Sequence, residues 1–131
     1  MRENDLTETL RERGDFDSGD AARDGAQATL RTLGERVAAG EAEAVADHLP
    51  NDLAGPLLTD GGDADAFSPS EFVDRVDRRE EVADGDAETH VRAVLGTLGE
   101  RVNRREWRDL RAQLPAEYGP LCETLGEVSE S

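Results

Sequence analysis

The chain has 131 residues, the usual length of one domain, and can bury a core without a disulfide or a metal ion. It carries 31 acidic against 15 basic residues, for a net charge of −16. Its single cysteine, Cys122, excludes an intrachain disulfide, and no apolar run approaches the roughly 18 residues that cross a bilayer. The first residues lack a signal peptide, so we expect a soluble cytoplasmic protein.

Every basic residue is arginine. A large net charge destabilises a compact chain by self-repulsion, but in molar salt the Debye length falls to about 3 Å and the repulsion is screened. We therefore interpret the composition as adaptation to a molar-salt cytosol, as in halophilic archaea. A disordered acidic chain is the alternative. The helical periodicity argues against it except at the ends, such as a disordered tail over residues 126–131.

The first half of the chain predicts three helices and a short tail. Its apolar positions recur at helical spacing: Leu6 and Leu10, then Ala26, Leu30, Leu33 and Val37, then Ala42, Val45 and Leu49. The second helix spans about residues 20–38, and Pro50 ends the third. A short helix is expected near residues 52–58, before an acidic, turn-like linker over residues 60–67.

The second half repeats the first. Residues 28–50 align without gaps on residues 93–115, and eleven of 23 positions are identical. Upstream, at an offset of 66, the matched pairs are Leu6 and Phe72, Leu10 and Val76, Arg13 and Arg79, Phe16 and Val82, and Asp20 and Asp86. The first helix of this half starts with a capping box, Ser68 to Glu71. Further helices are expected over residues 86–103, around Trp107 and Leu110, and near residues 116–125.

These patterns predict one all-α domain over residues 1–131. It would contain six to seven helices in two tandem three-helix repeats, residues 3–59 and 68–125. Because neither repeat has many large apolar residues, we expect both to share one core around a pseudo-twofold axis.

The repeated core resembles the domain of unknown function 2267 family. The run that carries the resemblance best is Leu95 to Leu121, LGTLGERVNRREWRDLRAQLPAEYGPL. The resemblance covers residues 3–125, and the first half departs where Asn51-Asp52-Leu53 replaces Ala116-Glu117-Tyr118. It implies an all-helical duplicated fold and a bacterial or archaeal source. It implies no established activity and supplies no catalytic residues.

Two charge pairs recur in both halves, Arg36 with Glu41 and Arg101 with Glu106. In each pair the arginine ends one helix and the glutamate begins the next, an order that both helix dipoles favour. We therefore predict a structural salt bridge at each helical corner.

Two glycines, Gly34 and Gly99, lie inside the longest helix of each half. A glycine there costs about 1 kcal/mol relative to alanine. Its presence in both halves predicts a close approach of two backbones, with simple tolerance as the alternative.

The halves differ most at five arginines, here called the arginine corner: Arg101, Arg104, Arg105, Arg108 and Arg111. The matching stretch of the first half keeps only Arg36. Arginine suits bidentate contacts with carboxylate or phosphate, so the corner predicts a docking site for an acidic protein surface or a nucleic acid. Internal pairing with Glu100, Glu106 and Asp109 is the alternative. Trp107 is expected in the core.

Metal and catalytic sites are not expected. His48 and His90 are predicted to be helix-surface residues, and neither has a second ligand at zinc spacing. The acidic turns 15–20 and 60–65 are interpreted as solvated. No phosphate loop, nucleophile elbow or Cys/His pair is present.

The function predicted from the sequence is a non-enzymatic helical interaction module without cofactor or metal. We expect it to bind a protein partner, or itself as a homo-oligomer, in a high-salt cytoplasm. A nucleic-acid-associated regulator that uses the arginine corner is the alternative. It is disfavoured because phosphate contacts weaken steeply with salt. An enzyme of unknown type is the third possibility.

Overall fold

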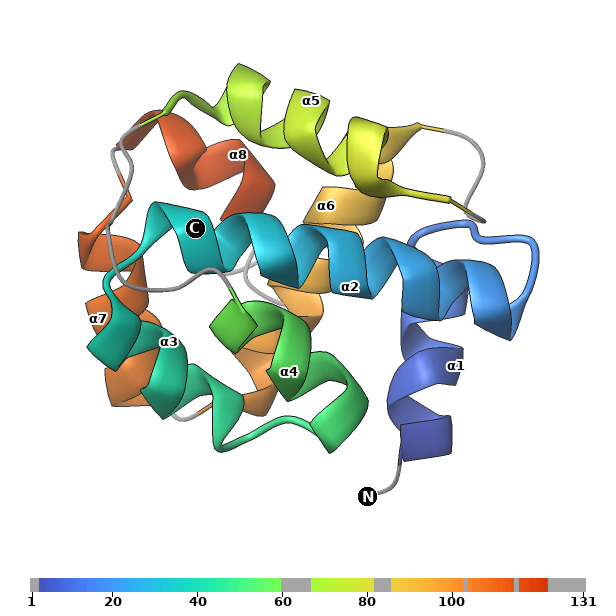
Figure 1. Cartoon of the computed structure of the whole chain (residues 1–131), viewed down its shortest axis with the longest axis horizontal. Helices are drawn as coiled ribbons and strands as arrows, with labels where there is room; N and C mark the ends of the chain where they lie inside the picture. Colours follow the sequence, from blue (N-terminus) through green and yellow to red (C-terminus); the bar gives the residue numbers. More distant parts are fainter. Residues whose placement is uncertain (1–2, 60–66, 82–85, 103, 115, 123–131) are drawn as a thin grey trace.

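The computed structural model describes residues 3–59, 67–81, 86–102, 104–114 and 116–122. These residues form helices and turns without a β-strand, which confirms the all-α prediction for the described ranges. In chain order the helices are α1 (Glu3–Arg13), α2 (Gly19–Arg36), α3 (Ala39–Ala46), α4 (Asn51–Thr59), α5 (Pro69–Arg79), α6 (Ala87–Arg101), α7 (Arg104–Ala112), the 3-10 helix η1 (Ala116–Tyr118) and α8 (Gly119–Cys122) (Figure 1). Most of the predicted linker and the whole predicted tail lie outside the described residues.

Side chains that satisfy free backbone N–H groups start several of these helices. The Ser68 hydroxyl accepts a hydrogen bond from the Glu71 N–H at 3.1 Å, with Pro69 in the first turn, as the capping box predicts. Ser18 caps α2 and Asp86 caps α6 in the same way. The sequence therefore marks these helix starts locally.

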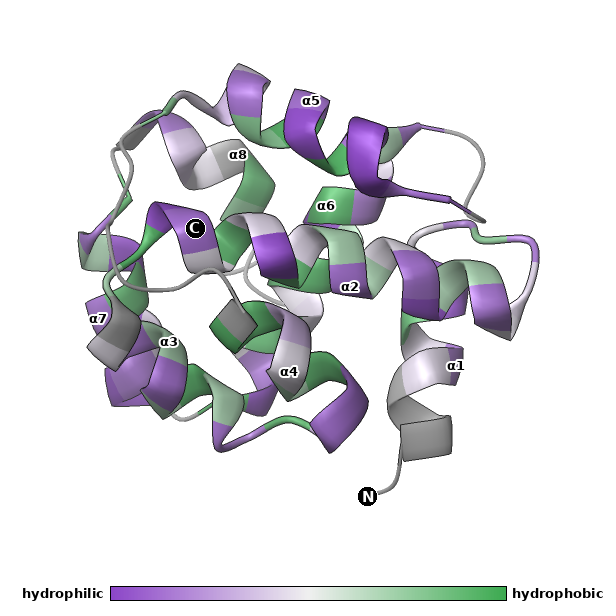
Figure 2. Cartoon of the chain, viewed as in Figure 1, coloured by the Kyte–Doolittle hydropathy of each residue, from purple (hydrophilic) through white to green (hydrophobic). Residues whose placement is uncertain are grey.

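Helix α2 is the centre of the fold. It packs against α1, α3, α4, α5 and α6, and Figure 1 shows it crossing the middle of the molecule with α5 on one side and α4 on the other. Helix α5 turns its hydrophobic residues toward this centre and its hydrophilic residues outward (Figure 2). A single core results, to which elements from both ends of the chain contribute.

The core is built from small aliphatic side chains with a few aromatic rings. Tyr118, Phe72 and Leu33 are fully buried. Trp107 is buried as predicted, and Cys122 is buried as well. In the part of the chain that the structure describes, no helix is long and apolar enough to cross a membrane.

Candidate functional site

The arginine corner lies where α6 ends and α7 begins. Arg101 is the last residue of α6, and the other four lie on α7. Arg101, Arg104, Arg105 and Arg108 are exposed, and Arg111 is half-buried. The buried side of α7 holds Trp107 and Leu110, so the arginines face away from the core.

None of these five arginines forms an ion pair or a side-chain hydrogen bond with another described residue. Six arginines elsewhere do form ion pairs: Arg11, Arg13, Arg23, Arg75, Arg78 and Arg79. The internal pairing considered for the corner is therefore absent among the described residues. Two of the acids considered for it bind elsewhere, because Glu100 pairs with Arg13 and Glu106 pairs with His48.

Helix α7 has two charged flanks. At 100° per residue, Arg104, Arg108 and Arg111 fall within about 60° of one another; we call them the arginine flank. The opposite flank, with Glu106, faces α3. Each flank thus has a different environment, and Glu106 is directed away from the arginine flank.

The flank that faces α3 holds two contacts between the helices. His48, at the end of the α3 segment, pairs with Glu106, and Glu41 of α3 accepts a hydrogen bond from the Gln113 side chain at 3.3 Å. Burial raises the pKa of Glu41, and the negative charges of Asp109 and Glu106 raise it further. This seam between α3 and α7 is acidic.

The predicted salt bridge between Arg36 and Glu41 is wrong. Arg36 is buried and donates from Nε to the Phe67 carbonyl at 3.1 Å and to the Tyr118 hydroxyl at 3.2 Å. Its Nη1 donates to the Gln113 carbonyl at 3.4 Å. The tertiary fold offers Arg36 acceptors from the second half of the chain, and Glu41 turns to Gln113 instead. The Arg101–Glu106 bridge is likewise not formed among the described residues, since Arg101 has no ion pair there.

Aromatic rings complete the surroundings of Arg36. The guanidinium carbon lies 5.2 Å from the centre of the Tyr118 ring and 5.8 Å from that of Phe67. The Tyr118 hydroxyl donates to the same Phe67 carbonyl. Burial raises the pKa of Tyr118, while the hydrogen bond from Arg36 acts against it. Arg36 is therefore a structural residue that ties the two halves together.

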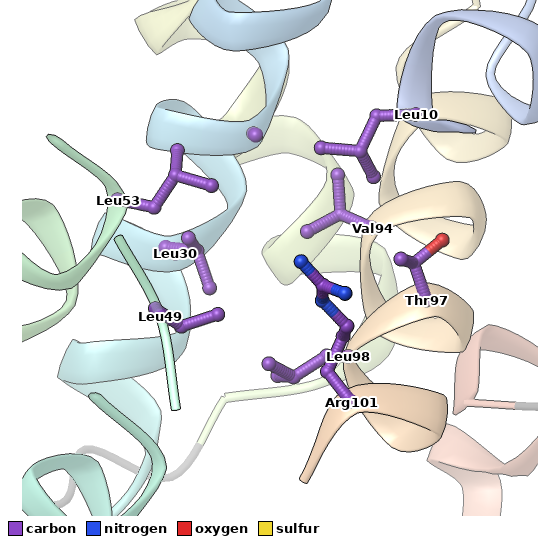
Figure 3. A pocket seen from close by; sticks show the side chains of 9 residues that line it. Leu10, Leu30, Leu49, Leu53, Val94, Thr97, Leu98 and Arg101 are labelled. Carbon is purple, nitrogen blue, oxygen red and sulfur yellow. The ribbon is translucent and has the colours of Figure 1, made fainter. Parts of the chain in front are cut away.

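Arg101 occupies the matching position in α6 but has different neighbours. It lines a cavity with apolar side chains of both halves, among them Leu30, Leu53 and Val94. Figure 3 shows its guanidinium directed into this cavity. The space is about 10 Å³, enough for about one water molecule. The cavity is too small to hold an organic ligand as it stands.

Gly34 lies where α2 crosses α4. A Cβ atom at this position would overlap the carbonyl oxygen of Leu57. The two backbones thus meet closely at Gly34. Gly99, its counterpart in α6, is half-buried.

His90 is not on the helix surface, which corrects the prediction for this residue. Its side chain is 1% exposed and its Nδ1 lies 2.7 Å from Oε2 of Glu80, which is 3% exposed. The ring stacks on Phe16 at 4.2 Å between centres. Burial raises the pKa of Glu80 against the opposing effect of His90. His48 is exposed, as predicted.

Sequence reasoning missed the Glu80–His90 pair, although one signal was available. The aligned positions of the first half are Gly14 and Gly25. A Cβ atom on Gly25 would lie 2.6 Å from the Phe16 ring and 3.1 Å from Glu80 Oε2. The missing side chain therefore makes room for the pair contributed by the second half.

Two further ion pairs join the halves through residues that the halves share. Arg13 Nη1 of α1 donates to Thr97 Oγ1 at 3.1 Å and lies 3.0 Å from Glu100 of α6. Arg79 of α5, which aligns with Arg13, donates to Thr32 Oγ1 at 3.0 Å and pairs with Glu35 of α2. Thr97 and Glu100 align with Thr32 and Glu35.

Glu35 is also the acceptor of a second arginine, Arg75, at 3.1 Å. Burial by itself raises the pKa of Glu35, but the hydrogen bonds and charges of Arg79 and Arg75 outweigh it and the net pKa is lowered. The glutamate of the LGER motif thus pairs with arginines of the other half in both cases: Glu35 joins α2 to α5, and Glu100 joins α6 to α1.

Metal coordination finds no support within the described ranges, where no three His, Cys, Asp or Glu side chains are grouped to hold an ion. The acidic turn at 60–65 lies wholly outside them. An open groove with a volume of about 670 Å³ lies between α3 and α4. It contains the carboxylates of Glu43 and Asp47 but no histidine, cysteine or basic side chain.

The chain was also compared with known proteins. No curated protein matches it. Residues 3–121 match the family described as Uncharacterized conserved protein (DUF2267). This match spans the helices that build the core and the arginine corner, and the chain therefore belongs to the DUF2267 family.

Proposed function

We propose that the chain is a non-enzymatic docking module that binds an acidic surface of a partner protein through the arginine corner. One observation carries this proposal: five arginines at one corner of an acidic chain have no ion pair among the described residues, whereas six other arginines do. Arginine presents a planar fork of donors that matches carboxylates bidentately.

The position of two of these arginines supports a binding role. Arg104 and Arg105 lie in the first turn of α7, where the helix dipole disfavours a cation. An acidic residue there would stabilise the isolated chain better. Binding to a partner would explain why arginines occupy these positions although they do not stabilise the isolated chain.

A protein partner fits the electrostatics better than a nucleic acid does. The net charge of −16 repels a polyanion, and contacts with phosphates weaken steeply as salt rises. A protein interface also gains from apolar contacts that salt does not screen. Nucleic-acid binding remains the alternative outcome of the test below.

The test is affinity capture of the full chain at molar KCl, with and without nuclease. We expect recovery of a partner that resists nuclease and is lost when Arg104, Arg105 and Arg108 are all changed to Glu. Reversal of Arg31 and Arg92, two exposed arginines outside the corner that also have no ion pair among the described residues, is the matched control. Recovery that is unchanged by the triple reversal would overturn the proposal, and release by nuclease would favour the nucleic-acid alternative.

We also infer that the chain arose by duplication and has pseudo-twofold symmetry. Three observations support this. The contacts of Arg13 and of Arg79 are reciprocal between the halves. The Glu41–Gln113 and Glu106–His48 contacts join aligned positions in both directions. Helix α5 packs on α2 as α1 packs on α6.

The composition further supports a source in a haloarchaeal, molar-salt cytoplasm. We expect helicity to be lost in dilute buffer and regained as salt rises, because salt screens the self-repulsion of the acidic surface. Circular dichroism from millimolar to molar KCl measures it. A thermal melt that is independent of salt over this range contradicts the proposal of salt adaptation.

A further inference from the structure

The groove between α3 and α4 is the acidic counterpart of the arginine flank. It is lined by Glu43, Ala44, Asp47, Leu49, Ala54 and Leu58, among others. Leu58 is a large hydrophobic side chain that is 44% exposed to solvent. The groove thus combines an apolar floor with two acidic side chains.

The two carboxylates of the groove have no ion pair within the described ranges. Glu43 lies on α3 and Asp47 at its C-cap, one helical turn further along, and both are exposed. In the alignment of the halves, Glu43 occupies the position of Arg108. At this aligned position the two halves therefore carry opposite charges.

The arrangement of α3 and α7 places these surfaces on one side of the molecule. The two helices pack against each other (Figure 1). The Glu41–Gln113 and His48–Glu106 contacts lie along their seam. The arginine flank lies on the edge of α7 away from this seam. The groove lies on the edge of α3 away from it, toward α4.

We propose that the groove receives the arginine flank of a second copy of this chain. A twofold axis along the α3–α7 pair exchanges its two edges, so each flank covers the groove of the other copy and the contact forms twice. Charge complementarity favours this occupant, because the unpaired carboxylates of the groove match the unpaired arginines of the flank. This inference rests on the proposed docking role of the arginine corner and assigns its partner.

Salt should strengthen this dimer. Two chains of charge −16 repel one another over long distances in dilute buffer. Molar salt removes this repulsion, while direct arginine–carboxylate contacts and the burial of Leu58 act at short range. An ordinary contact between oppositely charged proteins shows the reverse dependence.

The experiment is sedimentation equilibrium of the full chain in 2 M KCl at micromolar concentrations. The wild type should have twice the 14.2 kDa mass of one chain. Reversal of the groove, Glu43→Arg with Asp47→Arg, and reversal of the flank, Arg104→Glu with Arg108→Glu, should each raise the dimer dissociation constant at least about tenfold. Arg31→Glu with Arg92→Glu is the matched control and should leave it unchanged.

Mixing the two reversed variants is the decisive step. In the mixed dimer each groove again faces a flank of opposite charge, so the mixture should dimerise more tightly than either variant alone. Circular dichroism of each variant establishes that it is folded.

A wild type that is monomeric at every salt concentration, or a mixture that stays monomeric, overturns the inference. The docking proposal still stands in that case if capture of another protein depends on the arginine corner. If capture does not depend on these arginines, the docking proposal fails by itself.

Discussion

The Arg36 and Arg101 positions carry the same LGERV motif but have opposite environments. Arg36 is buried, with acceptors from Phe67, Gln113 and Tyr118. Arg101 is exposed and lies beside apolar side chains, including Leu53, which aligns with Tyr118. The comparison shows that an identical local motif does not determine what its arginine does. The residue supplied by the other half of the chain decides it.

The largest effect is expected when each arginine is replaced in turn, which tests the difference between the two positions. Arg36→Met should lower the free energy of unfolding by about 4 kcal/mol, because it removes hydrogen bonds of a buried charged group and leaves their acceptors unpaired. Arg101→Met should change it by less than about 0.5 kcal/mol. Urea unfolding at fixed molar KCl measures both. Equal losses would show that the two arginines have the same role.

Two glycines of the first half, Gly34 and Gly40, also differ in their surroundings. Gly34→Ala should cost about 3 kcal/mol, because the added methyl group meets the Leu57 carbonyl and α2 must move away from α4. Gly40→Ala is the control, since nothing lies within 4 Å of its Cβ position. That change should be neutral or slightly stabilising. The thermal unfolding midpoints of the two variants test the close approach, and similar midpoints would contradict it.

The role of Tyr118 at the buried arginine can be tested by itself. Tyr118→Phe keeps the ring but removes the hydroxyl that donates to Phe67 and accepts from Arg36. We expect a loss of about 1.5 kcal/mol in unfolding free energy. In a double-mutant cycle with Arg36→Met the losses should not add. Additive losses would mean that the hydroxyl acts independently of Arg36.

The Glu80–His90 pair, which the first half lacks, predicts a pH dependence. The pKa of Glu80 is raised by burial above its ordinary 4.5, so the folded chain holds this proton to higher pH than the unfolded chain. The contribution of Glu80 to the free energy of unfolding therefore falls as pH rises from 4.5 through the raised pKa. Relative to Glu80→Gln, the wild type should be most stable at the acidic end. Unfolding of both between pH 4 and 7 measures the difference, and the opposite slope would contradict the assignment.

The smallest effect on the free energy of unfolding is expected at the arginine corner, whose proposed role is binding. Arg104→Glu with Arg105→Glu should change the unfolding free energy by about 0.5 kcal/mol or less, toward stabilisation, because both residues lie in the first turn of α7. Loss of stability greater than about 1 kcal/mol would assign these arginines to the fold instead.

How far the sequence predicts this protein depends on the range of each interaction. Helix starts at Ser68 and the apolar faces of α2 and α6 were correctly placed, because capping and periodicity act within one or two turns. The alignment of Arg13 with Arg79 marked two residues as equivalent, but it did not indicate that each reaches the opposite half. The arginine corner was selected by comparison of the halves, and its exposure followed from the apolar face of Trp107 and Leu110.

The helices, the excess of acidic residues and the one cluster of arginines can therefore be read from local features of the sequence. The partners of the charged side chains, such as Tyr118 for Arg36 and His90 for Glu80, depend instead on how distant helices pack. A long side chain at a helix end can pair with any polar group that the packing of distant helices brings within about 3 Å. The neighbouring residues in the sequence do not determine which distant group lies this close.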